Sequence, residues 1–151
     1  MVEAGSSTVV GACWVDGQLV EPGTATVRAD DHAVVVGDGV FETMKVVDGA
    51  AFALSRHLRR LDRSAAGLRL DEPDKDRIRA AVDEVVAADP SAGLLRITWS
   101  SGAGPWGSSR GDGPGTLVVA SGPGNIWPPA ERVHLVPWKR NEHSPLVGLK
   151  T

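Results

Sequence analysis

The residue best suited to covalent chemistry is Lys150, whose primary amine follows the stretch 140–149. The four residues before it, 146–149, are apolar or glycine, and apolar surroundings disfavour the charged form of an amine. The cations Lys139 and Arg140 act in the same direction if the chain folds them close to the amine. A lysine amine can form a Schiff base with an aldehyde. Lys150 is therefore the candidate nucleophile.

A basic stretch at 56–63 supplies the candidate anion site. In a helix, Leu58 and Leu61 would point into the core, so that His57 and Arg60, three residues apart, share a neighbouring face. A guanidinium holds a phosphate through paired hydrogen bonds. The spacing alone favours the simpler interpretation, in which Arg60 is a solvated surface arginine.

Residues 37–43 read Gly-Asp-Gly-Val-Phe-Glu-Thr and form a second candidate binding segment. Glycines permit tight turns and let the backbone approach a ligand closely. Phe41, Glu42 and Lys45 lie on the strand that these glycines introduce. A turn followed by an edge strand explains the same residues, and alone it is the simpler interpretation.

The stretch 102–107 matches the pattern G-x-G-x-x-G, but the match carries little weight. This pattern binds a dinucleotide only where it opens a helix. Pro105 and the glycines and proline at 111–115 preclude a helix. We expect instead a mobile flap over a pocket at 100–115, in which Arg110 contacts an anionic substrate.

Composition narrows the classes of function. A chain of 151 residues is long enough for one domain with a core, and its net charge of −3 argues against a nucleic-acid binder. Cys13 is the only cysteine, which excludes an intrachain disulfide and favours a reducing compartment. It has no metal-ligand spacing with the histidines, so we expect no metal. Without a signal segment or a run of about 20 apolar residues, we expect a cytoplasmic protein and no membrane partner.

Two Asp-Gly turns, at 16–17 and 48–49, punctuate the first third of the chain. Asp-Gly readily supplies the positive φ angles of two-residue hairpin turns. The flanking residues therefore predict hairpins over 12–20 and 41–54. Between them, 30–39 is expected to be a turn-rich connector.

Apolar residues at helical spacing predict two helices after the hairpins, the first capped by Ser55 and the second ending at Asp89. Residues 94–99 and 116–120 predict strands, and 133–136 predicts the first strand of a second unit. We expect an α+β fold, a two-layer sandwich in which two helices cover one face of a mostly antiparallel sheet.

Three segments in this order resemble the fold-type IV, pyridoxal-phosphate-dependent enzymes. This family includes branched-chain aminotransferases, D-amino acid aminotransferases and 4-amino-4-deoxychorismate lyases. The segments are residues 37–43 with the turn at 48–49, residues 57–61, and residues 140–141 with 148–150. The resemblance covers essentially the whole chain after the first ten residues, and the combination with these separations is specific.

The resemblance implies pyridoxal 5′-phosphate (PLP) as the cofactor. Lys150 matches the lysine that holds it as an internal aldimine and then moves a proton between Cα and C4′. Arg60 matches the arginine that binds the cofactor phosphate, which reverses the simpler interpretation given above. Phe41 and Lys45 match positions that line the substrate side of the pocket, and Arg96 occupies a strand position near its mouth. The role of Glu42 stays open.

The resemblance also implies a division of the chain. Residues 1–125 correspond to the N-terminal domain, and 126–151 to a linker with the opening strand and lysine loop of the PLP-binding domain. That second domain continues past the lysine in the family, so we expect this chain to be the N-terminal part of a longer protein. The family forms homodimers with pockets near the subunit interface, so a homodimer is expected.

Two activities remain open within the resemblance. One is amino transfer between an amino acid and a 2-oxo acid, and the other is pyruvate elimination from aminodeoxychorismate to give 4-aminobenzoate for folate synthesis. Residues 98–102 read Thr-Trp-Ser-Ser-Gly and lack the arginine that D-amino acid aminotransferases place before this glycine, which weakens that specificity. A non-catalytic fragment or interaction module is the alternative from a different class.

Overall fold

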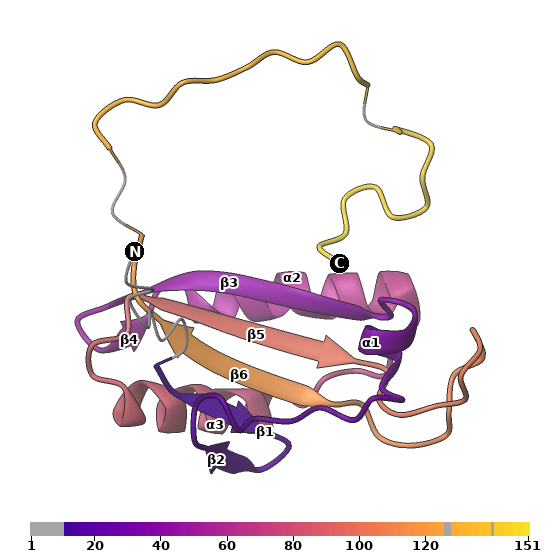
Figure 1. The fold of residues 1–151 in the computed structure, drawn as a ribbon, viewed down its shortest axis with the longest axis horizontal. Helices are drawn as coiled ribbons and strands as arrows, with labels where there is room; N and C mark the ends of the chain where they lie inside the picture. Colours follow the sequence, from indigo (N-terminus) through magenta and orange to yellow (C-terminus); the bar gives the residue numbers. More distant parts are fainter. Residues whose placement is uncertain (1–10, 126–127, 140) are drawn as a thin grey trace, which may run out of the picture.

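The computed structural model describes residues 11–125, 128–139 and 141–151. Within them the chain forms a six-stranded sheet and helices, followed by a C-terminal segment that arches away from the sheet and returns to it (Figure 1). The elements in chain order are β1 (Cys13–Val15), β2 (Gln18–Val20), α1 (His32–Val35), β3 (Gly39–Val47), β4 (Ala50–Ala51), α2 (Leu54–Leu68), α3 (Lys75–Ala88), β5 (Leu94–Ser100) and β6 (Leu117–Gly122).

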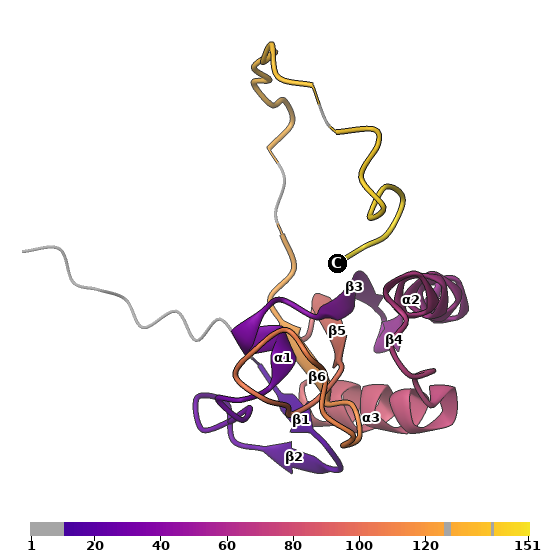
Figure 2. The ribbon, with the colours of Figure 1, turned by 90° about the vertical axis from the view of Figure 1, so that its right-hand side faces the viewer.

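The sheet has the order β2-β1-β6-β5-β3-β4, and every neighbouring pair is antiparallel. Helices α2 and α3 lie on the same face, α2 against β3 and α3 against β6 and β1 (Figure 2). The expected two-layer α+β architecture is therefore confirmed.

Alternation along the strands places the core between the sheet and these two helices. On β3, Val40, Glu42 and Met44 are buried, whereas the residues between them are partly or fully exposed. The fully buried Leu58 and Leu61 of α2 meet this face. Burying one such side chain stabilises the fold by roughly 1.5–3 kcal/mol. The face of each strand or helix that carries most apolar side chains is therefore the face that packs into the core.

Both predicted hairpins are confirmed. Asp16 and Gly17 have φ angles of 45° and 116°, and Asp48 and Gly49 have φ angles of 49° and 72°. Each turn joins an antiparallel pair, β1 with β2 and β3 with β4. The second hairpin is shorter than expected, because α2 begins at Leu54 immediately after it.

The start of α2 differs from the prediction that Ser55 caps it. The N-cap residue is Ala53, which has the left-handed conformation with φ 54° and offers no side-chain hydrogen bond. Leu54 already has helical geometry, because the hairpin turn delivers the chain into the helix one residue earlier. By contrast, Asp74 caps α3 by accepting hydrogen bonds from the amides of Asp76 and Arg77.

The connector 30–39 contains one element that the sequence reading missed, the single helical turn α1. Asp31 caps it by accepting from the Ala33 amide at 2.8 Å, and its other oxygen accepts from the hydroxyls of Ser100 and Thr116 at 3.0 and 2.6 Å. These partners lie 69 and 85 residues away, so local propensity alone does not indicate the turn.

Residues 133–136 do not form the predicted strand. A strand needs a neighbour for its amide and carbonyl groups, and the arch of residues 128–139 passes no sheet edge (Figure 1). The domain boundary at 125 stays a prediction. No helix in the described ranges is long and apolar enough to cross a bilayer.

Candidate active site

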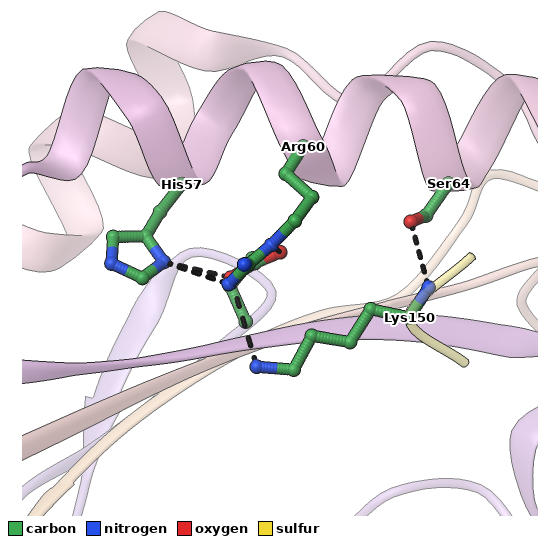
Figure 3. A network of polar contacts seen from close by, with 5 residues as sticks. His57, Arg60, Ser64 and Lys150 are labelled. Carbon is green, nitrogen blue, oxygen red and sulfur yellow. Dashed lines mark hydrogen bonds and ion pairs between the residues drawn. The ribbon is translucent and has the colours of Figure 1, made fainter. Parts of the chain in front are cut away.

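The free edge of β3 receives the end of the chain. Strand β4 pairs only with Val46 and Val47, so the first part of β3 has no strand on its outer side. There the Phe41 amide donates to the Lys150 carbonyl oxygen at 3.3 Å. The Lys150 amide donates to Oγ of Ser64 on α2 at 3.0 Å (Figure 3). The candidate nucleophile therefore lies between β3 and α2.

A close contact of Leu149, the residue before Lys150, supports this position of the C-terminal segment against α2. A Cβ atom placed on Gly67 of α2 would come within 2.7 Å of both terminal methyl carbons of Leu149. The glycine thus lets the C-terminal segment approach the helix. A run of small residues on α2 at 64–67 was the sequence signal for this approach, and the sequence reading did not use it.

The side chain of Lys150 is 31% exposed and extends toward a carboxylate. Its Nζ atom is 3.8 Å from Oε2 of Glu42 and 5.0 Å from the centroid of the Phe41 ring. The prediction that this amine has apolar surroundings is therefore wrong, because its neighbours are the carboxylate of Glu42 and the ring of Phe41. Lys139 is exposed, and Arg140 lies outside the described residues.

Glu42 is the centre of the site, and its side chain is fully buried. Arg60 donates from Nε to Oε1 at 2.6 Å and from Nη2 to Oε2, and His57 donates from Nδ1 to Oε2 at 2.7 Å. Burial alone would raise the pKa of the Glu42 carboxyl. The hydrogen bonds from Arg60 and His57 and the charge of Lys150 outweigh burial and hold this pKa below its usual value.

Arg60 and Lys150 thus meet at one oxygen atom, Oε2 of Glu42, although ninety positions separate them. Figure 3 shows both side chains directed into the space between α2 and β3. The Arg60 side chain is 41% exposed, and among the described residues its Nη1 atom has no hydrogen-bond partner. An accessible guanidinium edge remains for an anion.

The residues expected to face a substrate lie on the other face of the sheet. Phe41 and Lys45 alternate with the buried positions of β3, and Arg96 projects from β5 beside them. The Arg96 guanidinium carbon lies 3.8 Å from the centroid of the Phe41 ring, a cation–π distance. Because Phe41 also contacts Lys150, the structure joins Phe41 and Arg96 to the site, while Lys45 lies further along β3. Their contact with a substrate stays a prediction.

Arg110 occupies an anchoring position within the expected flap. Its Nε and Nη2 atoms donate to Asp38 at 2.6 and 2.7 Å, and it also donates to the carbonyl oxygens of Leu68 and Arg69. The hydrogen bonds from Arg110 hold the pKa of Asp38 below its usual value. Contact of Arg110 with an anionic substrate stays a prediction, since its donors here hold the loop to α2 and β3.

A pocket of about 600 Å³ adjoins this anchor. Its lining includes Asp38 before β3, Arg110 from the flap, and Leu146 and Thr151 from the C-terminal segment. The pocket therefore lies between the flap, the end of α2 and the C-terminal segment, and its lining does not include Lys150 or Arg60. In the described residues, histidine, cysteine and acidic side chains form no group that could hold a metal ion.

The fold and these contacts can be compared with known proteins. The family model described as amino-transferase class IV matches residues 39–151, from the first residue of β3 onward. The chain belongs to this family. The matched region contains Phe41, Glu42, Arg60 and Lys150, which are the residues that the structure brings together.

Named class IV relatives cover both activities considered above. A Mycobacterium tuberculosis protein named bifunctional aminodeoxychorismate lyase / D-amino acid transaminase is 45% identical over 92 residues, which are 58% of this chain and 32% of that protein. A D-alanine aminotransferase of Listeria innocua is 39% identical over 48% of this chain and 26% of that protein. The chain thus spans between a quarter and a third of the length of these relatives.

Solved structures of the family agree with the fold. A hypothetical aminotransferase from Mycobacterium tuberculosis, described as a PLP-bound form, superposes with a TM-score of 0.64 at 38% identity, over 74% of this chain and 39% of that one. A 4-amino-4-deoxychorismate lyase from Pseudomonas aeruginosa gives a TM-score of 0.65 at 26% identity, over 77% and 41%.

Proposed function

We propose that this chain contributes to a PLP-dependent aminotransferase that moves an amino group between an amino acid and a 2-oxo acid. The observation that carries the proposal is the meeting of Lys150 and Arg60 at the buried carboxylate of Glu42. An amine and a guanidinium held close together match the two functional groups of PLP, its aldehyde and its phosphate.

The described residues fit this cofactor. Lys150 would hold the aldehyde carbon through its amine, and the Nη1 edge of Arg60, without a partner among the described residues, would donate to the phosphate. The mycobacterial neighbours described as PLP-bound and as alpha-ketoglutarate and PMP-bound support this choice. When bound, the cofactor supplies an electron sink for the carbanion formed at the substrate Cα.

The remaining residues bind and orient the substrate. The amine of Lys150 accepts and returns the Cα proton as a general base. Phe41 supplies an apolar wall beside this amine, and the cation of Arg96 above its ring suits a substrate carboxylate. Lys45 supplies a further positive charge on the same face of the sheet.

The second candidate function is 4-amino-4-deoxychorismate lyase activity. The bifunctional name of the mycobacterial relative and the Pseudomonas aeruginosa lyase structure favour it. Both reactions begin with the same loss of a Cα proton, so Lys150 serves either. Among amino acid substrates, the relatives named D-alanine aminotransferase and D-amino-acid transaminase favour the D series.

Cofactor binding is tested on the full-length protein with Lys150→Ala and Lys139→Ala, an exposed lysine of the same segment, as the matched control. We expect PLP to give a visible absorbance band and a borohydride-trapped adduct at Lys150 in the wild type and in Lys139→Ala, but not in Lys150→Ala. Turnover should fall by about 10⁴-fold in Lys150→Ala, the upper range for a general base. No trapped adduct in the wild type would favour the interaction module and end the proposal.

The two activities are separated by their co-substrates. Transamination requires a 2-oxo acid acceptor, and we measure it with D-alanine or a branched-chain amino acid and 2-oxoglutarate. Pyruvate release from aminodeoxychorismate without any acceptor would establish the lyase. The expected homodimer and the cytoplasmic location remain proposals, and sedimentation of the full-length protein tests the former.

A further inference from the structure

We propose that Glu42 is a positioning residue that aims the guanidinium of Arg60 at the cofactor phosphate. This inference rests on the proposed function, because it assigns Glu42 a task within that same site. Neither the family match nor the neighbouring structures assign this residue a role.

The geometry of the Arg60–Glu42 pair leaves one orientation for the guanidinium. Two parallel hydrogen bonds, from Nε to Oε1 and from Nη2 to Oε2, form a bidentate fork. Such a fork fixes the plane of the guanidinium as well as its distance. The edge that carries Nη1 then points away from the carboxylate, and it is the edge without a partner in the described part of the chain.

The position of Glu42 in the strand makes this carboxylate immobile. It occupies a core-facing register position between Val40 and Met44, and its side chain is fully buried. A buried carboxylate without donors would cost several kcal/mol. Here Arg60 and His57, three residues apart on α2, both donate to it. The carboxylate is therefore a rigid point from which a long, half-exposed arginine is oriented.

The contacts around Oε2 distinguish this arrangement from an ordinary structural ion pair. The atom receives Nη2 of Arg60 and Nδ1 of His57, and Nζ of Lys150 lies 3.8 Å from it. A structural pair has no reason to include the amine that we propose as the nucleophile. The carboxylate that orients Arg60 therefore lies beside the amine of Lys150.

The test measures two dissociation constants, for PLP and for pyridoxal, which lacks the phosphate. A residue that acts through Arg60 affects only the ligand that carries the phosphate. We expect Glu42→Gln to weaken PLP binding about tenfold and to leave pyridoxal binding within twofold. In an Arg60→Gln background the added Glu42→Gln should have no further effect, since coupled residues are not additive. Glu72→Gln, which removes an exposed carboxylate paired with Lys75, is the matched control.

Equal losses for PLP and pyridoxal, or additive losses in the double variant, would overturn the inference and leave the proposed function intact. A wild-type protein that does not bind PLP would overturn both. If Glu42→Gln does not fold, Glu42→Asp provides the same test, because it keeps the charge and withdraws the carboxylate from Arg60. An unchanged ratio of PLP to pyridoxal affinity in Glu42→Asp would again contradict the positioning role.

Discussion

Two described parts of the chain are held in different ways: residues 11–125 with the sheet and helices, here called the packed domain whatever its true boundary, and the C-terminal segment of residues 128–139 and 141–151. In the domain, strands and helices satisfy one another and bury residues such as Ile97 and Leu61 completely. In the segment, Val133 and Leu135 are 87% and 92% exposed, and the chain arches clear of the sheet (Figure 1). The segment carries Lys150, whereas Glu42, Arg60 and Phe41 around it belong to the sheet and α2.

The difference shows how the site is assembled. Lys150 is seated through two backbone hydrogen bonds and the contact of Leu149 with Gly67. Glu42 lies in the buried row of β3, and Arg60 and His57 of α2 are hydrogen-bonded to it. The cluster of Glu42, Arg60 and His57 thus meets a lysine that docks by a few contacts, and disturbing either part should have different consequences.

The largest difference should appear in global stability. Leu61→Ala removes a fully buried side chain from the core and should lower the free energy of unfolding by about 3 kcal/mol, within the usual range of 2–5. Leu135→Ala, in the segment, should change it by less than about 0.5 kcal/mol because the side chain is exposed. Urea unfolding of both variants measures this. Similar losses in the two would contradict the division into a packed domain and a docked segment.

The docking itself is tested by Gly67→Ala. The added Cβ would lie 2.7 Å from the methyl carbons of Leu149, so this side chain must shift. We expect the shift to loosen the segment from α2 and to lower the protection of the Lys150 amide from hydrogen exchange about tenfold or more. Global stability should not fall, since alanine in a helix is favoured over glycine by roughly 0.5–1 kcal/mol. Adding Leu149→Ala removes the clash and should restore the protection. No restoration would show that Leu149 does not seat the lysine.

A smaller effect is expected at the loop anchor. Arg110→Ala releases the flap from Asp38 and from the end of α2, at a cost of about 1 kcal/mol for a partly exposed pair. Because the pKa of Asp38 is lowered in the folded protein, the contribution of the pair is complete above the ordinary value of 3.8 and is lost as the pH falls below it.

Hydrogen exchange of the flap amides, corrected for intrinsic rates at each pH, measures this anchor. Wild-type protection should decline in acid, whereas Arg110→Ala should have little protection to lose at any pH. The control is Arg79→Ala. Arg79 makes one long, exposed side-chain hydrogen bond, to Ser55 at 3.4 Å, so this variant should behave as the wild type. If the flap amides of Arg110→Ala remain protected, contacts other than those of Arg110 hold the loop in place.

The smallest effect concerns the start of α2. Ala53 has a φ of 54°, in the left-handed region, which is unfavourable for most residues other than glycine. Ala53→Gly should therefore stabilise the domain by about 0.5–1 kcal/mol without altering the docking of Lys150. Thermal unfolding and exchange of the Lys150 amide test the two parts of this expectation. A loss of stability would mean that the greater freedom of glycine in the unfolded chain outweighs the relieved strain.

Much of the architecture followed from local patterns. The strand-forming residues at 94–99, the spacing of Leu58 and Leu61, and the Asp-Gly turns at 16–17 and 48–49 with the residues that flank them predict elements that the structure contains. The resemblance to class IV enzymes also identified Lys150 and Arg60 as partners across the chain. The resemblance therefore predicted that these two residues lie close together, although it did not indicate the contacts that hold them there.

Other features depend on contacts between distant residues. Asp31 accepts from Ser100 and Thr116 as well as from the local Ala33 amide. Arg110 donates to Asp38, which lies 72 positions earlier in the chain. Residues 133–136 have the composition of a strand, but they lack a neighbour to pair with. In each case the deciding partner lies outside any local window.

Periodicity and residue type determined which positions face the core, because burial follows the geometry of a strand or helix. The sequence placed Glu42 on a strand and left its role open, and the structure shows it on the buried face of β3, where an isolated acid would be unfavourable. The tertiary structure decided what that carboxylate contacts, because Arg60 and His57 reach it from α2 and Lys150 reaches it from the C-terminal segment. The hydrogen bonds from Arg60 and His57 and the charges of Arg60 and Lys150 offset the cost of its burial. Electrostatic compensation depends on distances in space, and the order of residues along the chain does not contain them.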